Sequence, residues 1–84
     1  MTVEMREVAS TNVAAIGYDE ASKTLCVEFF GGSRYRYADV PASLYEDLCL
    51  APSVGRYLRE HVIIPTTAGR PRHPATRLLP TDAW

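Results

Sequence analysis

The sequence predicts a small α+β domain, in which an antiparallel three-stranded β-meander is followed by two helices packed on one face of the sheet. Three observations lead to this fold class. Residues 24–30 alternate apolar and polar side chains with the period of a strand. Two glycines, Gly31 and Gly32, follow directly and are typical of a hairpin. Beyond Pro41, apolar residues recur at helical spacing, so strands precede helices instead of alternating with them.

Length and composition limit the organisation and the function of the chain. The 84 residues suffice for one small domain with one core. We expect this domain over residues 1–64, and an irregular tail containing proline and arginine over residues 65–84. The net charge of -1 gives no global field that would attract nucleic acid or an anionic membrane. The sequence contains no membrane-spanning apolar run and no secretory signal, so we expect a cytoplasmic protein with no membrane partner.

Extended structure is expected before the glycine pair. Residues 2–10 alternate weakly and predict an extended segment. Residues 13–18 form an apolar run of strand length, and the mostly polar residues 19–23 then predict a turn. The next strand sorts its side chains onto two faces, with Leu25, Val27 and Phe29 on one and Cys26 and Glu28 on the other.

The register of the hairpin follows from the chemistry of the paired faces. A two-residue loop would set Arg34 opposite Phe29 and so mix charged with apolar side chains. A three-residue loop over residues 30–32, folded as a type I turn followed by a left-handed glycine, keeps each face uniform. It pairs Leu25 with Tyr37, Val27 with Tyr35 and Glu28 with Arg34. We therefore expect the tyrosines of the third strand on the core face, and its arginines, Arg34 and Arg36, in solvent.

Two short amphipathic helices are expected after the strands. Pro41 suits the first turn of a helix, in which apolar residues recur at helical spacing until Pro52 stops it. Ser53 is a good N-cap for the second helix. Gly55 lies in the first turn of that helix, where its low helix propensity indicates a close packing contact. His61 falls on the apolar stripe of the same helix and is expected to be a half-buried core residue.

A set of residues between Ser10 and Ile64 carries a family resemblance: Ile16-Gly17-Tyr18-Asp19, Leu25, Val27, Phe29, Gly32, Tyr35-Arg36-Tyr37, Val40-Pro41, Tyr45, Leu48, Ala51-Pro52-Ser53, Gly55 and Tyr57-Leu58. In this order and spacing they resemble the KTSC domain family, which takes its name from the C-terminal regions of lysyl-tRNA synthetases. The resemblance implies no catalytic residues, and it implies RNA binding only as a suggested role. The tail beyond Ile64 lies outside it.

Four arginines are the candidate binding residues: Arg34, Arg36, Arg56 and Arg59. They are consistent with an anion-binding surface, or with a solvated face on which Glu28 and Glu60 pair with them. Tyr35 and Tyr37, separated by an arginine, match the pattern of aromatic and basic residues on which nucleic-acid bases stack. The register of the hairpin favours a structural role for both tyrosines instead, and we assign the same kind of role to Gly32, Pro41, Ser53 and Gly55.

No spacing in the sequence predicts catalysis, a metal site or a cofactor. Cys26 and Cys49 lie in no metal-binding or redox spacing, so we expect two buried, reduced thiols. Neither His61 nor His73 belongs to a recognisable arrangement of acid, base and nucleophile. We therefore expect that the protein is not an enzyme and that it carries neither a cofactor nor a metal.

These observations favour a small non-catalytic binding module whose partner is RNA or another protein. In the first hypothesis it binds RNA or a nucleotide through Arg34 and Arg36 on an open sheet face. The alternative is a protein-interaction module, including a phage or mobile-element inhibitor, that uses the sheet face or the apolar tail residues Leu78, Leu79 and Trp84. Capture of a small anionic ligand is a third hypothesis. An exposed sheet edge makes a monomer or a weak homodimer consistent with the sequence.

Overall fold

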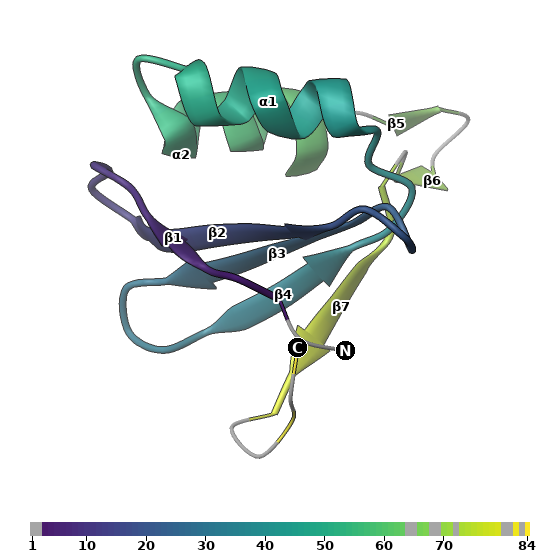
Figure 1. Ribbon diagram of the computed structural model, residues 1–84, viewed down its shortest axis with the longest axis horizontal. Coiled ribbons are helices and arrows are strands. Elements are labelled where there is room, and N and C mark those ends of the chain that lie inside the picture. Colours follow the sequence, from purple (N-terminus) through teal and green to yellow (C-terminus); the bar gives the residue numbers. More distant parts are fainter. Residues whose placement is uncertain (1–2, 64–65, 68–69, 72, 80–81, 83) are drawn as a thin grey trace.

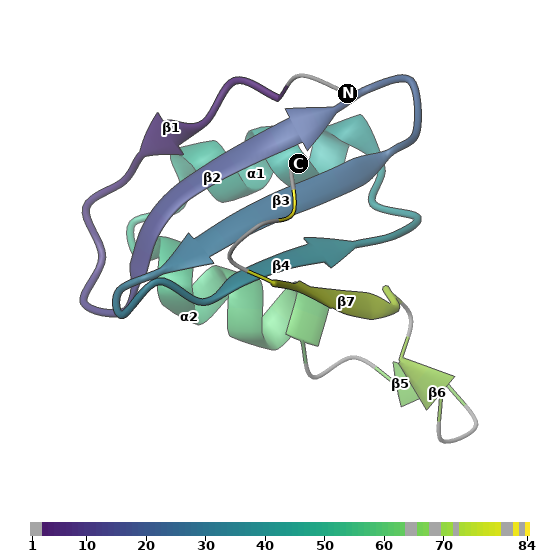
Figure 2. The same ribbon diagram turned by 90° about the horizontal axis from the view of Figure 1, so that it is seen from below.

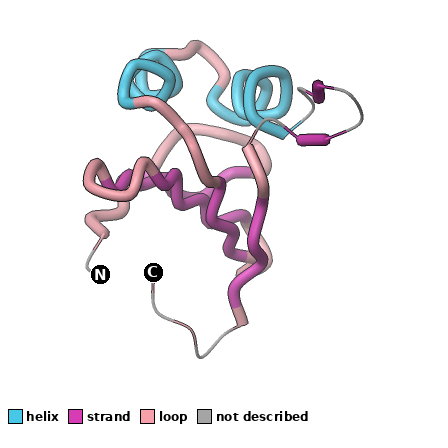
Figure 3. Tube along the Cα trace, turned by 90° about the vertical axis from the view of Figure 1, so that its right-hand side faces the viewer, coloured by secondary structure: helices cyan, strands magenta, loops and turns pink. Residues whose placement is uncertain are grey.

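The computed structural model describes residues 3–63, 66–67, 70–71, 73–79, 82 and 84. Its main feature is an antiparallel five-stranded sheet of order β1-β2-β3-β4-β7, with the helices in one layer over one face (Figure 1). Figure 3 shows these two layers from the side. The elements, in chain order, are β1 (Arg6–Glu7), β2 (Val13–Asp19), β3 (Thr24–Phe29), β4 (Arg34–Tyr37), α1 (Ala42–Leu50), α2 (Val54–Leu58), the π-helical turn η1 (Arg59–Ile63), β5 (Thr66–Thr67), β6 (Arg70–Pro71) and β7 (Ala75–Leu78).

The α+β class is confirmed, but the expectation of three strands is wrong. β1 extends the sheet at one edge by pairing with β2, and β7 extends it at the other edge by pairing with β4. β7 lies in the segment for which the sequence predicts an irregular tail. Four residues are too few for a strand pattern to stand out, and pairing with β4 fixes their conformation. The division between residues 1–64 and 65–84 stays a prediction, although the sheet takes strands from both sides of it.

The hairpin between β3 and β4 has the predicted register. Its Cα partners are Leu25 with Tyr37, Val27 with Tyr35 and Glu28 with Arg34. The turn type differs from the prediction. The amide of Gly32 donates to the carbonyl oxygen of Phe29 at 3.1 Å, and Gly31, the third residue of that turn, has φ +97°. A positive φ at this position belongs to a type II turn and excludes type I, so the two glycines are used differently from the expectation.

The core lies between the helix layer and the sheet. Its fully buried side chains come from both layers: Val13, Ile16, Leu25, Val27, Val40, Leu48, Leu58 and Val62. Tyr18 of β2 joins the layers, because its hydroxyl donates to the carbonyl oxygen of Val40 at 2.5 Å and its ring stacks on that of Tyr45, with 5.1 Å between the centroids. The sheet and the helices therefore share one core, which fixes the position of the strand that carries Arg34 and Arg36.

The start of α2 agrees with the sequence. The Ser53 side chain accepts a hydrogen bond from the Arg56 amide at 3.4 Å, which confirms the predicted N-cap. Gly55 makes the predicted close contact, since a Cβ atom there would stand 2.3 Å from Oδ1 of Asn12. Glycine therefore lets the first turn of α2 approach the segment before β2.

The end of this helical region departs from the sequence prediction. After Leu58 the helix widens into η1, in which side chains no longer follow the 3.6-residue period. His61 is exposed and lies against Tyr57, with 4.2 Å between the ring centroids. The prediction that His61 is a half-buried core residue is therefore wrong.

The face of the sheet away from the helices is partly covered by both end regions of the chain. Met5 lies on this face at Gly17, where a Cβ atom would stand 2.6 Å from the Met5 sulfur. Figure 2 views the sheet from this side and shows the C-terminal end over the same face. Cys26, the Cα partner of Gly17, is fully buried there. The open sheet face expected from the sequence is therefore only partly open.

Candidate functional site

The four arginines named from the sequence lie on two different sides of the molecule. Arg34 and Arg36 belong to β4 and point away from the helices. Tyr35 and Tyr37, which alternate with them along the strand, pack toward the core. Arg56 and Arg59 lie exposed in the helix layer on the other side of the sheet. The fold therefore brings them together in pairs and not as one patch. Whether either pair binds a ligand stays a prediction.

Arg56 has a local partner on its own helical segment. Its Nε lies 3.0 Å from Oε1 of Glu60, one helical turn later, and both side chains are more than half exposed. An exposed ion pair of this type contributes only about 0.3–0.5 kcal/mol to stability. The contact keeps the guanidinium beside a carboxylate, which lowers the positive charge that this surface offers to an anion.

Arg34 is bound by the C-terminal segment. Its Nη2 donates to the carbonyl oxygens of Leu79 at 3.0 Å and of Asp82 at 2.7 Å, and its Cζ lies 5.1 Å from the centroid of the Trp84 ring. Leu79 and Asp82, which offer these carbonyls, are joined by hydrogen bonds in both directions. Arg34 is half-buried as a result. The prediction that its side chain stands free in solvent is therefore wrong.

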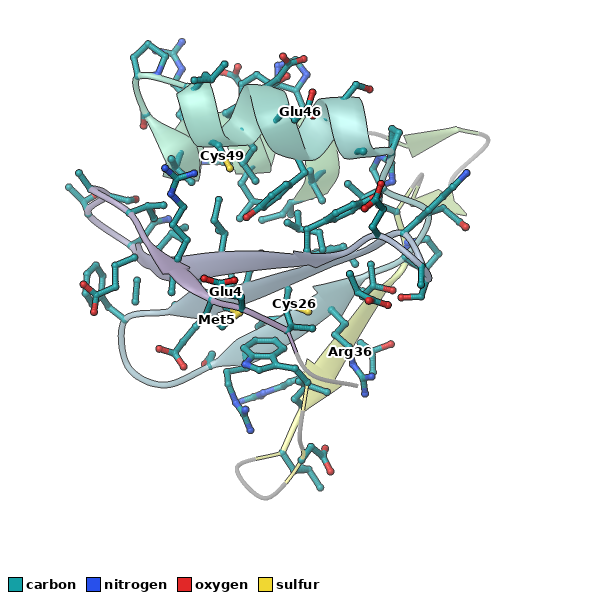
Figure 4. All side chains as sticks on the ribbon, viewed as in Figure 1. Glu4, Met5, Cys26, Arg36, Glu46 and Cys49 are labelled. Carbon is teal, nitrogen blue, oxygen red and sulfur yellow. The ribbon has the colours of Figure 1, made fainter. Side chains whose placement is uncertain are left out.

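Arg36 is also half-buried and lies beside Cys26, its Cα partner on β3. Figure 4 shows both residues on the side of the sheet away from the helices, where Met5 also lies. Burial raises the pKa of the Cys26 thiol to about 11, and the nearby Arg36 charge only partly opposes this. The thiol therefore stays protonated at neutral pH and is a poor nucleophile. Both cysteines are free thiols; Cys26 is buried as expected, and Cys49 is only half-buried.

A hollow of about 510 Å³ opens between the β4–β7 edge of the sheet and η1. We call it the aromatic hollow, and its lining residues are Phe29, Tyr35, Tyr37, Val62, Ile63, His73 and Ala75. The ring of Tyr35 meets the ring of Phe29 edge on at 5.8 Å and stacks on that of Tyr37 at 6.3 Å. A volume of this size lies within the range of sites that bind small ligands or side chains, about 300–1,000 Å³.

His73 is a buried polar residue in this lining. The residue is 6% exposed, and its Nδ1 lies 3.0 Å from the carbonyl oxygen of Asp39 and 3.3 Å from that of Ala38. Because both neighbours are acceptors, Nδ1 donates to them. The fold thus holds a buried imidazole ring in the lining of a site that is otherwise aromatic and aliphatic.

The Tyr37 hydroxyl remains neutral over the physiological range. Burial, followed by the charge of Tyr35, raises the pKa of Tyr37 to about 12. Sequence reasoning placed both tyrosines on the core face, as the structure has them, but it did not identify the hollow. His73 and Ala75 were missed because they lie in the segment without a recognisable pattern, and the only signal there was a histidine between two prolines.

The described residues form a hollow that is lined mainly by aromatic and aliphatic side chains. Within them, no group of three or more His, Cys, Asp or Glu side chains is placed to hold a metal ion. No helix in the described part of the chain is long and apolar enough to cross a membrane. An aromatic and aliphatic hollow of this kind can recognise a side chain or a small ring, and no carboxylate is among its lining residues.

Comparison with known proteins identifies relatives of this chain. A protein of Tsukamurella paurometabola is 41% identical over 54 residues, which are 64% of this chain and 81% of that protein. A lysine–tRNA ligase of Nostoc punctiforme is 38% identical over 50 residues, which are 60% of this chain but only 9% of the ligase. This chain therefore resembles a small part of that enzyme.

A solved structure shares the fold, and a family model matches the sequence. The crystal structure of a KTSC domain protein from Yersinia pestis superposes with a TM-score of 0.75, covering 92% of this chain and 99% of that one at 24% identity. This likeness supports the fold. The KTSC domain family matches residues 9–63, more than half of the sequence. The chain therefore belongs to the KTSC domain family.

Proposed function

We propose that the chain is a non-catalytic protein-interaction module, which binds an apolar or aromatic side chain of its partner in the aromatic hollow. The observation that carries this proposal is the lining, in which three aromatic rings and three aliphatic side chains accompany one buried histidine. Ile63 at the hollow is 43% exposed, so apolar surface remains available to a partner. Interface hot spots are typically desolvated pockets of this kind.

The sheet face that carries Arg34 and Arg36 is less suited to bind a ligand than the aromatic hollow is. The Arg34 guanidinium already binds two carbonyl oxygens and a tryptophan ring of its own chain. Glu28, its Cα partner across the hairpin, adds a negative charge to the same face. An anionic ligand would therefore have to replace existing contacts there, whereas a side chain entering the hollow would not.

A pair of neighbouring substitutions on β7 tests the proposal. Ala75 and Thr76 are both exposed, but Ala75 lines the hollow and Thr76 faces the other side of the strand. A library of random short peptides is displayed and selected on the full chain. Ala75→Phe fills the hollow and should weaken the selected peptides about tenfold or more, while Thr76→Phe should leave their affinity unchanged. Equal affinities for the two variants, or no selected peptide at all, would contradict the proposal.

RNA binding is a second candidate function, and one observation favours it: a relative that shares this domain is named as a lysine–tRNA ligase. Arg34 and Arg36 would then contact phosphates, and the affinity must fall as salt rises. Titration of a lysine tRNA transcript at low and at moderate salt, with Arg34→Gln plus Arg36→Gln as the comparison, tests this. Absence of binding at both salt concentrations would exclude it, and so would an affinity that the double substitution leaves unchanged.

A further inference from the structure

The outer edge of β7 carries backbone groups that point away from the sheet. β7 is the last strand in the order of the five-stranded sheet. Its ladder with β4 pairs Arg36 with Thr76, and the Ala38 amide donates to the Pro74 carbonyl at 2.9 Å. In an antiparallel ladder, alternate residues exchange both hydrogen bonds with the neighbouring strand. Pro74, Thr76 and Leu78 therefore point their backbone groups toward β4, and those of Ala75 and Arg77 point outward.

The two residues with outward backbone groups also lie on the same side of β7 as the aromatic hollow. Ala75 and Arg77 are the Cα partners of Tyr37 and Tyr35, so all four side chains share the helix-facing side of the sheet. Ala75 lines the hollow, and its small side chain leaves the space open. A strand added beside β7 would have the hollow next to one of its side chains.

We infer that the partner binds as an extended strand added to β7, antiparallel to it, with one side chain in the aromatic hollow. This inference rests on the proposed function. The peptide residue opposite Ala75 exchanges backbone hydrogen bonds with it and directs an aromatic or branched aliphatic side chain into the hollow. The residue two positions earlier lies opposite Arg77, on the same side, and is Asp or Glu because Arg77 is exposed and positively charged.

A second copy of this chain fits the same edge less well. Two copies paired through β7 would bring two Arg77 side chains onto one side of one short ladder, which like-charge repulsion disfavours. Registers that pair Ala75 with Ala75 or with Arg77 set one of these residues beside each hollow, and neither has a large apolar side chain. The register that sets Leu79 there pairs Arg77 directly with Arg77, which like charge disfavours. A peptide with a carboxylate and an aromatic residue two positions later satisfies both features.

Substitutions at Arg77 separate the contribution of its backbone N–H to peptide binding from the contribution of its side-chain charge. Arg77→Pro removes an outward N–H, which a sheet edge tolerates, and Arg77→Ala removes the charge but keeps the N–H. Fluorescence anisotropy measures the affinity of a selected peptide for each full-length variant. We expect Arg77→Ala to weaken binding about threefold, and Arg77→Pro to weaken it at least tenfold more with little change in melting temperature. The same peptide, N-methylated at the residue that faces Ala75, should lose binding to the parent chain.

The outcomes separate this inference from the proposed function. If Ala75→Phe abolishes binding while Arg77→Pro binds as well as Arg77→Ala, the proposal that a side chain enters the hollow stands. The inference that the peptide adds a strand to β7 is then wrong. If selected peptides lack the acidic residue two positions before the anchor, the assignment of Arg77 is wrong. If the free chain sediments as a dimer that Arg77→Pro converts to a monomer, the edge is occupied by a second copy and the peptide assignment is overturned.

Discussion

Gly17 controls how the N-terminal segment lies on the sheet. A Cβ atom there would stand 2.6 Å from the Met5 sulfur and 2.9 Å from the Glu4 carbonyl oxygen, and backbone cannot yield as easily as a side-chain end. We expect Gly17→Ala to lower the free energy of unfolding by about 1–3 kcal/mol. Because Cys26 is the Cα partner of Gly17, displacement of the segment should also speed thiol modification at Cys26.

The comparison for this experiment is the parent chain in a Cys49→Ser background, so that Cys26 is the single thiol. Urea denaturation and the rate of reaction with a disulfide reagent are measured on both proteins. Unchanged stability together with an unchanged reaction rate would show that the N-terminal segment does not pack on Gly17.

The Tyr37 hydroxyl should make the fold sensitive to alkali. Its pKa is about 12 in the folded protein against an ordinary value of 10, so the unfolded chain loses this proton first as the pH rises. The stability held by the neutral phenol is complete below pH 10 and is lost between about pH 10 and 12, by at most about 2–3 kcal/mol.

Tyr37→Phe removes this share of the pH dependence while keeping the ring. Urea denaturation at several pH values between 10 and 12 should therefore give a shallower decline for Tyr37→Phe than for the parent chain. Identical slopes in this range would contradict the raised pKa. Part of the decline that remains comes from Tyr45 and Cys26, because burial raises their pKa values to about 12 and about 11.

At the scale of elements, the turn between β3 and β4 depends on two residues with positive φ. Gly31 has φ +97°, and no heavy atom lies within 4 Å of the position of its missing Cβ. Any cost of a side chain there is conformational and not steric against neighbours. We expect Gly31→Ala to destabilise by about 1–2 kcal/mol.

The same position tests the cause through chirality. D-alanine at residue 31, introduced by chemical synthesis, favours positive φ and should be neutral or stabilising by about 0.4–1 kcal/mol. Denaturation of the L-alanine, D-alanine and glycine proteins provides the comparison. If both alanine forms destabilise equally, the cost does not come from the backbone conformation.

The sequence predicted the central elements because several signals agreed there. In the hairpin, alternation on both strands, the glycines and the charge pairing of Glu28 with Arg34 allowed one consistent register. The turn type was not predictable, since glycine permits both forms. β7 offers only four residues with no alternation, and it becomes a strand because β4 has a free edge. The hollow needs β7 and η1 together, so its lining by His73 and Ala75 could not be anticipated.

At the scale of the whole molecule, β7 makes the C-terminal region part of the fold. Leu78 is 5% exposed, whereas the adjacent Leu79 is 64% exposed. Leu78→Ala should therefore lower the free energy of unfolding by about 2–3 kcal/mol, while Leu79→Ala should stay within about 0.5 kcal/mol of the parent. Chemical denaturation of both variants measures the difference. Equal effects would mean that the last strand is not part of the cooperative unit.

Strand addition beside the aromatic hollow is tested most directly by amide hydrogen exchange, measured by NMR on the full chain with and without a selected peptide. Without peptide, the Thr76 and Leu78 amides are protected by β4, and those of Ala75 and Arg77 exchange quickly. With peptide, the Ala75 and Arg77 amides should become protected. Strand addition would be contradicted by protection that appears only around Arg34 and Arg36, or by fast exchange at Ala75 and Arg77 in the saturated complex.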